Sequence, residues 1–400
     1  MMKRILSLLL CAVFLLPLLP MDTNAAEPVT VNLYNWGQYL SDGSDGCIDV
    51  IAEFEAKYPH IKVNQMTFDS NESMYTKLKT GGSSYDVIIP SDYMVARLID
   101  EGMLLPLNFD NIPNYQYIDE AYKNTSYDPE NLYSVPYTWG TVGVIWNSDY
   151  VDEADVGSWE LLWNEKYAGK ILMFDNPRDA FAVAELLLGY SLNTTDEEEL
   201  RAASYKLIEQ KPLVQSYVMD QIYDKMERGE AWIAPYYAGD YLMMAEDHPE
   251  LQFFFPEEGY NLFIDAMCIP SCAENKEAAE AYINFLCDPQ NCGPNLEYLA
   301  YSSPETASKE YMDPAVTESE VAYPDEETLS RGESFYYLDA ETTQLMDSLW
   351  LGVKTDGDVD YVPIIGISVV FLSVAGFLTA RAVRDKRRRA NRCKKWKEQA

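Results

Sequence analysis

Extended and helical patterns alternate along the first hundred residues of the chain. Val29–Trp36 and Ile61–Phe68 are β-rich runs, and apolar residues between them, at 50–58, recur on one helical face. Residues 71–79 predict a second helix, and residues 86–90 a short apolar strand. Strands that alternate with helices in this way favour a parallel sheet covered by helices, which is an α/β fold.

The same pattern returns in the second half of the chain. Extended runs occur at 169–174, 230–236 and 261–269, and helical patterns at 180–188 and 275–286. Two such series in one extended body predict two lobes with a cleft between them. Ligands in sheets of this kind bind beyond the carboxyl ends of the strands.

Both ends of the chain resemble sorting sequences. Lys3 and Arg4 precede an apolar run and small residues, which predicts a signal peptide over residues 1–26. After a linker at 351–361, residues 362–380 are uncharged and apolar, and a helix of that length spans about 28 Å. The basic tail at 381–400 places the C-terminus in the cytoplasm and the body outside it. A buried helix followed by a basic tail is the alternative.

The charge of the chain is concentrated in its body. The sequence carries 30 Lys plus Arg against 65 Asp plus Glu, a net charge of −35. Both ends are positive, which leaves −44 for residues 27–360. An acidic body of this kind does not bind nucleic acid through phosphates. It suits cationic partners, or simply solubility.

The cysteines do not predict a metal centre. The extracytoplasmic body has five of them, and export permits disulfides, so Cys287 and Cys292 are close enough in sequence to form a local bridge. Their spacing with Cys268 and Cys272 loosely resembles a zinc site. Free buried cysteines are common, however, and we expect neither a metal nor a cofactor.

Aromatic residues stand beside carboxylates or hydroxyls at the predicted strand ends. Such pairs occur within residues 34–39, 90–93, 174–179 and 236–241. Carboxylates hold ammonium groups in charge-assisted hydrogen bonds, and ring faces attract cations, so these clusters favour an organic polycation. The alternative is structural, with Trp36 and Tyr39 as core residues and Ser91, Asp179 and Asp240 at helix N-termini, Asp240 directly before a helix that begins at Tyr241.

Asp265 is harder to explain structurally. It lies inside an apolar strand, where period-two alternation places it on the same face as Phe263. A carboxylate in that position costs free energy unless it has a partner.

Several longer motifs point to one family. They are YNW at 34–36 with Tyr39, SNESMYTKLKT at 70–80, YDVIIPS at 85–91, SVPY at 134–137 with Trp139 and Gly140, LGYS at 188–191 with NTTD at 193–196, and YPD at 323–325. From about residue 31 to residue 349 the chain resembles the spermidine/putrescine-binding proteins of bacterial polyamine ABC importers, which are type II extracytoplasmic solute-binding proteins.

The resemblance implies a two-lobed, periplasmic-binding-protein-like α/β fold of type II, with the ligand cleft between the lobes. Lobe 1 is expected at 27–143 and 264–312, and lobe 2 at 144–263 and 313–350. The C-terminal transmembrane helix is an addition to this fold.

The resemblance also implies a set of ligand-binding residues. They are Trp36, Gln38, Tyr39, Ser91, Tyr93, Asn176, Asp179, Tyr237, Asp240, Phe263, Asp265 and Tyr301. Tyr237 and Phe263 stand where the spermidine-preferring relative has tryptophans. Gln38 and Asn176 replace two of its acids, and Phe335 replaces a polar contact in a loose part of the alignment. Residues 238–240 resemble the corresponding segment of the putrescine-binding relative. A site with fewer acids suits a ligand with fewer ammonium groups, so the resemblance favours putrescine slightly over spermidine.

The function implied is a membrane-anchored, monomeric receptor that captures putrescine or spermidine and delivers it to the permease subunits of an ABC transporter. One alternative keeps the fold and binds another organic cation or an amino compound. Another is a cation-binding surface adhesin. An enzyme is not expected, because His60 and His248 are the only histidines, and we find no nucleophile motif or phosphate loop.

Overall fold

The computed structural model describes residues 28–82 and 84–355. The signal peptide, the transmembrane segment at 362–380 and the cytoplasmic tail that the sequence predicts all lie outside these residues. Within them, no helix combines the length and the apolar character needed to cross a membrane.

The strands of the described residues form one ten-stranded sheet. Eight of them follow the order β2-β1-β3-β9-β4-β7-β5-β6, while β10 pairs with β9 and β8 with β4. The strands are β1 (Val29–Trp36), β2 (Ile61–Phe68), β3 (Val87–Ile88), β4 (Ser134–Asn147), β5 (Ile171–Phe174), β6 (Val214–Val218), β7 (Ile233–Tyr237), β8 (Leu251–Phe254), β9 (Tyr260–Cys268) and β10 (Gly332–Ser334).

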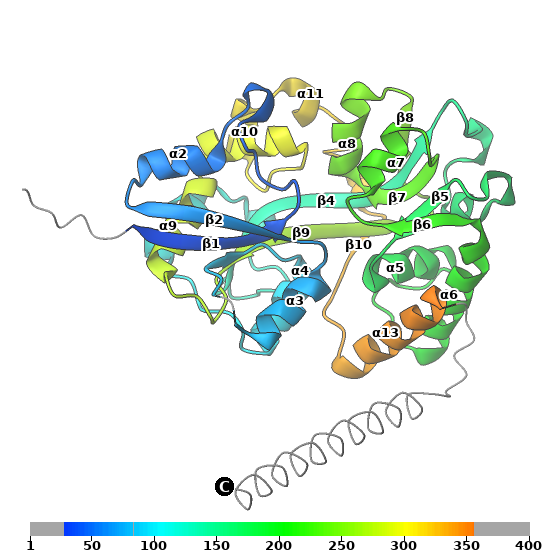
Figure 1. Ribbon diagram of the computed structural model, residues 1–400, viewed down its shortest axis with the longest axis horizontal. Coiled ribbons are helices and arrows are strands. Elements are labelled where there is room, and N and C mark those ends of the chain that lie inside the picture. The colour runs from blue at the N-terminus through cyan, green and yellow to red at the C-terminus, as the bar shows by residue number, and fades with distance from the viewer. Residues whose placement is uncertain (1–27, 83, 356–400) are drawn as a thin grey trace, which may run out of the picture.

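Helices cover both faces of this sheet (Figure 1). They are α2 (Val50–Lys57), α3 (Asn71–Thr80), α4 (Asp92–Asp100), α5 (Pro177–Leu187), α6 (Glu197–Gln210), α7 (Ile222–Glu227), α8 (Ala238–Asp247), α9 (Lys276–Leu286), α10 (Pro289–Leu299), α11 (Pro314–Thr317), α12 (Glu326–Leu329) and α13 (Ala340–Lys354).

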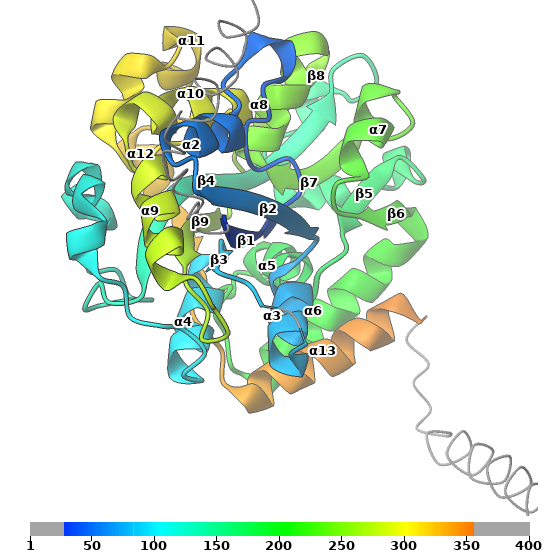
Figure 2. The same cartoon turned by 60° about the vertical axis from the view of Figure 1, so that its left-hand side comes forward.

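The first lobe is a three-layer arrangement, in which alternate residues of β1 face opposite layers. Leu33 belongs to the core cluster that contains Phe54 of α2. Tyr34, the next residue, belongs to a second cluster with Met74 of α3 and Leu98 of α4. Figure 2 shows the edge of the sheet with α2 above it and α3 and α4 below it. Period-two alternation therefore supplies both faces of this half of the sheet with core residues.

The second lobe is built on β5, β6 and β7. All four residues of β5 are completely buried, as expected for a strand covered on both faces. In Figure 1, α7 and α8 lie above this part of the sheet, and α5, α6 and α13 lie below it.

Two long strands connect the lobes, and they make the sheet mixed. The first part of β4 pairs with β9, and its second part pairs with β7 and β8, all antiparallel. The expectation of a parallel sheet holds for β1 with β2 and β3, and for β5 with β6 and β7. It is wrong at the crossing, because β4 and β9 carry the chain between the lobes in opposite directions.

Several element boundaries differ from the predicted ones. The strand expected at 86–90 is limited to Val87–Ile88, although β1 and β2 match their predicted bounds. The helix expected to begin at Tyr241 begins at Ala238, so Asp240 lies within its first turn. The last helix, α13, continues to Lys354 and occupies the start of the expected linker.

The four cysteines whose spacing drew attention in the sequence form no disulfide with one another. Cys287 and Cys292 are both buried and free, so the local bridge considered from the sequence is not formed. Cys268 is also a free buried thiol, and Cys272 is a free exposed one. Across residues 28–82 and 84–355, no group of three or more His, Cys, Asp or Glu side chains is placed to hold a metal ion.

Candidate functional site

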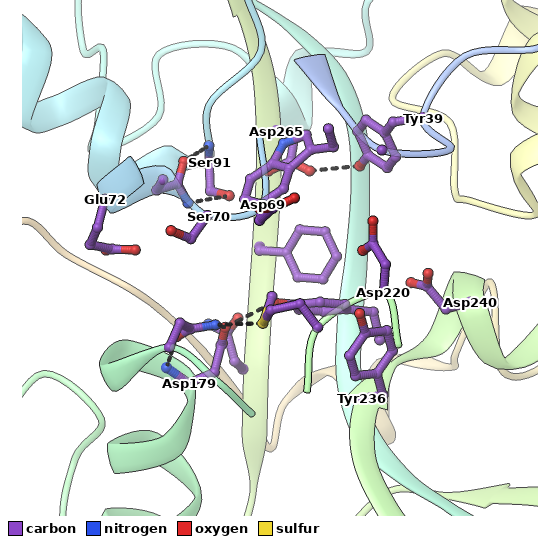
Figure 3. Close-up of a pocket in the computed structure, with 18 of the residues that line it drawn as sticks. Tyr39, Asp69, Ser70, Glu72, Ser91, Asp179, Asp220, Tyr236, Asp240 and Asp265 are labelled. Atoms are coloured by element: carbon purple, nitrogen blue, oxygen red, sulfur yellow. Dashed lines mark hydrogen bonds between the residues drawn. The ribbon is translucent and has the colours of Figure 1, made fainter. Parts of the chain in front are cut away.

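A cavity opens between the two lobes, at the carboxyl ends of the parallel strands (Figure 3). The empty space at the cavity is about 780 Å³, including solvent at its open edge. The structure brings all twelve predicted site residues to this cavity: Trp36, Gln38, Tyr39, Ser91, Tyr93, Asn176, Asp179, Tyr237, Asp240, Phe263, Asp265 and Tyr301. Phe335, which the looser part of the resemblance indicated, also lines it.

Asp265 lies on β9 and is almost completely buried. The Tyr39 hydroxyl donates a hydrogen bond of 2.6 Å to its Oδ2 atom. Its Oδ1 atom has no hydrogen-bond partner among the described residues. Burial is the main cause that raises the pKa of Asp265 to about 6; the hydroxyls of Ser91 and Tyr39 oppose the rise, and the nearby carboxylate of Asp179 adds a smaller contribution to it. Asp265 therefore keeps one buried acceptor available for a ligand.

Asp240 lies in the first turn of α8, held by two tyrosines. The Tyr223 hydroxyl donates to Oδ1, and the Tyr301 hydroxyl donates to Oδ2. The Tyr301 ring packs directly on Gly239, where any side chain would collide with it. Burial raises the pKa of Asp240 to about 6. The glycine is thus required for the tyrosine ring to approach the helix and reach the carboxylate.

Asp179 lies in the first turn of α5, beneath its N-cap residue Asn176. The Asn176 Oδ1 atom accepts the backbone N–H of Asp179 at 2.8 Å, and its Nδ2 atom donates to the Asp179 Oδ2 atom at 2.6 Å. The Tyr237 hydroxyl donates to the same oxygen at 2.8 Å. Burial raises the pKa of Asp179, and these hydrogen bonds oppose the rise. Asn176, not Asp179, is therefore the helix cap.

Glu72 and Tyr93 mark another wall of the cavity. The Tyr93 hydroxyl donates a 2.9 Å hydrogen bond to Glu72 Oε1, and Asn71 donates to the same hydroxyl at 3.1 Å. Burial raises the pKa of Glu72. Ser91 precedes α4, but its side chain does not cap that helix and instead accepts a hydrogen bond from Asn71.

Two further acids, Asp69 and Asp220, lie at the exposed edge of the cavity. Asp220 approaches the first lobe so closely that a Cβ atom at Gly37 would lie 2.6 Å from its Oδ2 atom. Next to Gly37, Gln38 lines the cavity with a left-handed backbone (φ 48°). The absence of a side chain at Gly37 therefore allows the two lobes to come into close contact at this edge of the cavity.

The cavity has an acidic and aromatic lining. Its carboxylates are Asp69, Glu72, Asp179, Asp220, Asp240 and Asp265, and none of its lining residues is Lys, Arg or His. Figure 3 shows Glu72 and Asp240 at opposite sides, with Asp265 and Asp179 facing each other between them. Such a site offers ammonium groups several anionic partners and no repelling cation.

Aromatic rings form a continuous surface between the acids. The Phe263 ring meets Tyr237 at 5.5 Å and Tyr301 at 6.3 Å between centroids, and Tyr301 meets Tyr39 at 5.1 Å. All three contacts are edge-to-face, a preferred geometry for aromatic pairs. The rings supply an apolar surface for methylene groups, and their faces attract cations.

The sequence interpretation missed several lining residues. They are Gly37, Asp69, Ser70, Asn71, Glu72, Met219, Asp220, Tyr236 and Asn261. Residues 69–72 directly follow β2, and Met219 and Asp220 directly follow β6. The rule that ligands bind beyond strand carboxyl ends would have found both groups, but β6 was not recognised as a strand.

Comparison with known proteins identifies the class of the chain. Residues 49–324 match the family described as bacterial extracellular solute-binding protein. The chain belongs to this family. It is therefore a solute-binding transport protein and not an enzyme, and its binding body lies outside the cytoplasm.

Individual relatives of this solute-binding protein carry more specific names. It is 34% identical over 311 residues to the spermidine/putrescine-binding periplasmic protein of Salmonella typhimurium, covering 78% of this chain and 87% of that one. It is 29% identical to the putrescine-binding periplasmic protein SpuD of Pseudomonas aeruginosa, covering 83% and 93%.

A solved structure agrees with the two-lobed fold. The substrate-binding protein PotD of a spermidine/putrescine ABC transporter from Streptococcus pneumoniae is 35% identical, with a TM-score of 0.69. The match covers 82% of this chain and all of the solved one.

Proposed function

We propose that this solute-binding protein captures putrescine and related polyamines outside the cytoplasm and delivers them to the permease of an ABC importer. The twelve predicted residues would form its binding site. The single observation that carries this proposal is the buried Oδ1 atom of Asp265, which has no hydrogen-bond partner among the described residues and lies in a cavity to which these residues contribute no cationic side chain. A buried carboxylate of this kind needs a cation to compensate for its desolvation.

The arrangement of the acids favours a linear ligand with a cation at each end. Glu72 and Asp240 stand at opposite sides of the cavity, and the rings lie between them (Figure 3). Ammonium groups would pair with the acids at the two ends, while the methylene chain packs on the rings of Tyr237 and Phe263. The names of the relatives support the same ligand class.

Ligand capture would involve movement of the lobes. We take the lobes as residues 27–143 with 264–312, and 144–263 with 313–350, so β4 and β9 cross the boundary between them. A hinge in these crossing strands would open the cavity for entry and close it around the ligand.

The membrane anchor and the partners belong to the same proposal. Residues 362–380 would hold a monomeric body at the outer face of the cell membrane, with residues 381–400 in the cytoplasm. Such tethering raises the effective concentration of the receptor near the permease.

Titration calorimetry of the full-length protein in detergent tests the proposal. Putrescine and spermidine should both be tried, and putrescine is expected to bind at one saturable site. The neutral analogue 1,4-butanediol and the amino acid 4-aminobutanoate are matched controls, because neither presents an ammonium at both ends. Absence of heat and of a thermal shift with both polyamines would contradict the proposal.

Tighter binding of 4-aminobutanoate than of putrescine would instead support the alternative ligand class, an amino compound. The acidic lining argues against that outcome, because the carboxylate of such a ligand would face six acidic side chains and no cationic one among the described lining residues. Cation binding without saturation would support the adhesin alternative.

A further inference from the structure

Phe335 reaches the cavity from a segment that has no regular secondary structure. It directly follows β10 and belongs to the chain that leads to α13, which passes between the two lobes (Figure 1). Its side chain is only 5% exposed, whereas that of the next residue, Tyr336, is 54% exposed. The Phe335 ring meets the ring of Tyr93, on α4 of the first lobe, at 5.6 Å between centroids. Phe335 therefore forms part of the cavity wall and contacts the first lobe at the same time.

The side chain of Asn193 holds the backbone on both sides of Phe335. Asn193 lies in the loop between α5 and α6 of the second lobe. Its Nδ2 atom donates a 2.8 Å hydrogen bond to the Ser334 carbonyl, and its Oδ1 atom accepts the Tyr336 N–H at 2.7 Å. Successive side chains of an extended backbone point to opposite sides, so these two bonds fix the direction in which the Phe335 side chain points.

The other partners of Asn193 show why an amide is needed at this position. The Nδ2 atom also donates to Glu333 Oε1 at 2.9 Å, and the Oδ1 atom also accepts from Arg178 Nη2 at 2.8 Å. An amide has two donor and two acceptor positions, and all four are used here. A carboxylate of the same shape would place an oxygen against the Ser334 carbonyl and the Glu333 carboxylate.

Arg178 of α5 holds the Phe335 ring from the second lobe. Its guanidinium carbon lies 4.4 Å from the centre of that ring, and its Nη2 atom also donates to the Tyr336 carbonyl at 3.1 Å. Arg178 is only 5% exposed, and a cation attracts a ring face most strongly where both groups are shielded from water. The ring of Phe335 is therefore held between Arg178 of the second lobe and Tyr93 of the first.

We propose that Asn193 is a positioning residue of the binding site and acts through Phe335. By fixing the backbone around Phe335, it keeps this ring in the cavity wall and in contact with Tyr93, and it thereby favours closure of the lobes on a ligand. Asn193 is not itself among the residues that line the cavity. The inference rests on the proposed polyamine function.

A double-mutant cycle tests whether Asn193 acts through Phe335. Calorimetry of the full-length protein in detergent measures the putrescine affinity of Asn193→Ala, Phe335→Leu and the double variant. Each single substitution should weaken binding about fivefold, because the ring contact with Tyr93 is loosened or lost. The double variant should also be weakened about fivefold, whereas independent effects would multiply to about 25-fold. Multiplied effects, or wild-type affinity in Asn193→Ala, would overturn the proposal.

Thr194→Ala is the matched control for a general loss of stability in the same loop. The Thr194 hydroxyl donates to Glu199 and accepts the Asp196 N–H, and none of these three residues lines the cavity. Thr194→Ala should lower the free energy of unfolding and leave putrescine affinity unchanged. An equal loss of affinity in Thr194→Ala and Asn193→Ala would overturn the specific role of Asn193.

A second pair of variants decides the question if Asn193→Ala does not fold. Asn193→Asp keeps the size of the side chain but removes its donor, and it should weaken putrescine binding about fivefold for the same reason. Thr195→Asp adds the same charge at an exposed position of the loop and should not weaken binding. Equal affinities of Asn193→Asp and Thr195→Asp would overturn the proposal.

Hydrogen exchange of the ligand-free protein tests the same contacts without a polyamine. The Tyr336 amide should exchange faster in Asn193→Ala than in the wild type, because its acceptor is removed, and it should exchange at the wild-type rate in Thr194→Ala. Unchanged exchange in Asn193→Ala would overturn the positioning role. Failure of the wild-type protein to bind either putrescine or spermidine would instead refute the proposed function, so the two failures are distinguishable.

Discussion

Asp265 carries a buried carboxylate that the protein itself compensates only in part. Its carboxylate is buried on an apolar strand, and within the described part of the chain only its Oδ2 atom accepts a hydrogen bond, from Tyr39. Ordinary core residues avoid this situation because an incompletely paired buried charge is costly. A cationic ligand would remove that cost when it binds, so Asp265 should contribute to affinity more than an exposed acid does.

Replacing Asp265 tests this directly. Asp265→Asn should weaken putrescine binding about 10- to 100-fold, because a charge-assisted hydrogen bond contributes about 1.5–3 kcal/mol. Asp110→Asn is a matched control, since Asp110 is an exposed acid that does not line the cavity. Calorimetry with both variants decides the question. Equal affinities for the two would show that only the overall charge matters.

The raised pKa values of Asp265 and Asp240 predict how binding depends on pH. Burial raises both to about 6, whereas the ammonium groups of a diamine stay protonated throughout this range. Above pH 7 both carboxylates are ionised and ready to pair. Below pH 6 the free protein must release protons before it binds, so putrescine affinity should fall, by about 100-fold from pH 7 to pH 5.

Calorimetry between pH 5 and pH 8 measures this dependence. Repeating the titration at pH 5.5 in two buffers with different ionisation enthalpies should reveal proton release on binding. Affinity that is constant, or that rises toward pH 5, would rule out a role for these carboxylates in pairing with the ligand.

At the scale of single elements, helix N-termini position the acids. Asp179 and Asp240 lie in the first turns of α5 and α8, which begin where strands β5 and β7 end. Acidic residues are favourable at helix N-termini because of the helix dipole, so the same local rule stabilises the helix and places the carboxylate at the cavity. This explains why local sequence patterns could suggest both a capping and a binding role for these residues.

The cap of α5 allows the two roles to be separated. Asn176→Ala should lower the free energy of unfolding by about 1 kcal/mol, because it removes the cap hydrogen bond to the Asp179 N–H. It should also weaken putrescine binding several-fold, since Asp179 loses the Asn176 side chain that orients it. Urea denaturation and calorimetry measure the two effects.

Asp196→Ala is the matched control for this experiment. Asp196 caps α6 by accepting the backbone N–H groups of Glu198 and Glu199, and it does not line the cavity. It should cause a similar loss of stability without a loss of affinity. If both variants bind putrescine equally well, Asn176 has only a structural role.

At the scale of the whole molecule, β4 and β9 hold the lobes in contact. In the structure both lobes contribute walls to the cavity, and Asp220 of one half approaches Gly37 of the other. Six carboxylates line the cavity between the lobes, and they repel one another in the absence of a cation. We therefore expect the ligand-free protein to favour a more open arrangement of the lobes than the ligand-bound protein.

Small-angle X-ray scattering of the full-length protein in detergent checks this expectation. The radius of gyration of the body should decrease when saturating putrescine is added, because the lobes close on the ligand. Asp265→Asn should show no decrease at the same putrescine concentration. An identical scattering profile with and without ligand would contradict hinge closure.

The sequence by itself determined the local features of this protein. Period-two and helical spacing located β1, β2 and α9, and motif resemblance pointed to all twelve predicted residues, each of which lines the cavity. Composition separated an acidic body from a basic tail. These properties depend on residues that are near one another in the sequence or on the overall composition, and both can be obtained from the sequence alone.

Only the tertiary structure decided which distant groups meet. Glu72 and Asp220 both line the cavity, although they follow β2 and β6, which stand at opposite ends of the strand order. Arg178 acquires its position behind Tyr93 and Phe335 through the packing of separate segments. Distances between such residues depend on how strands pair and lobes close, and hydrophobic periodicity carries no information about that.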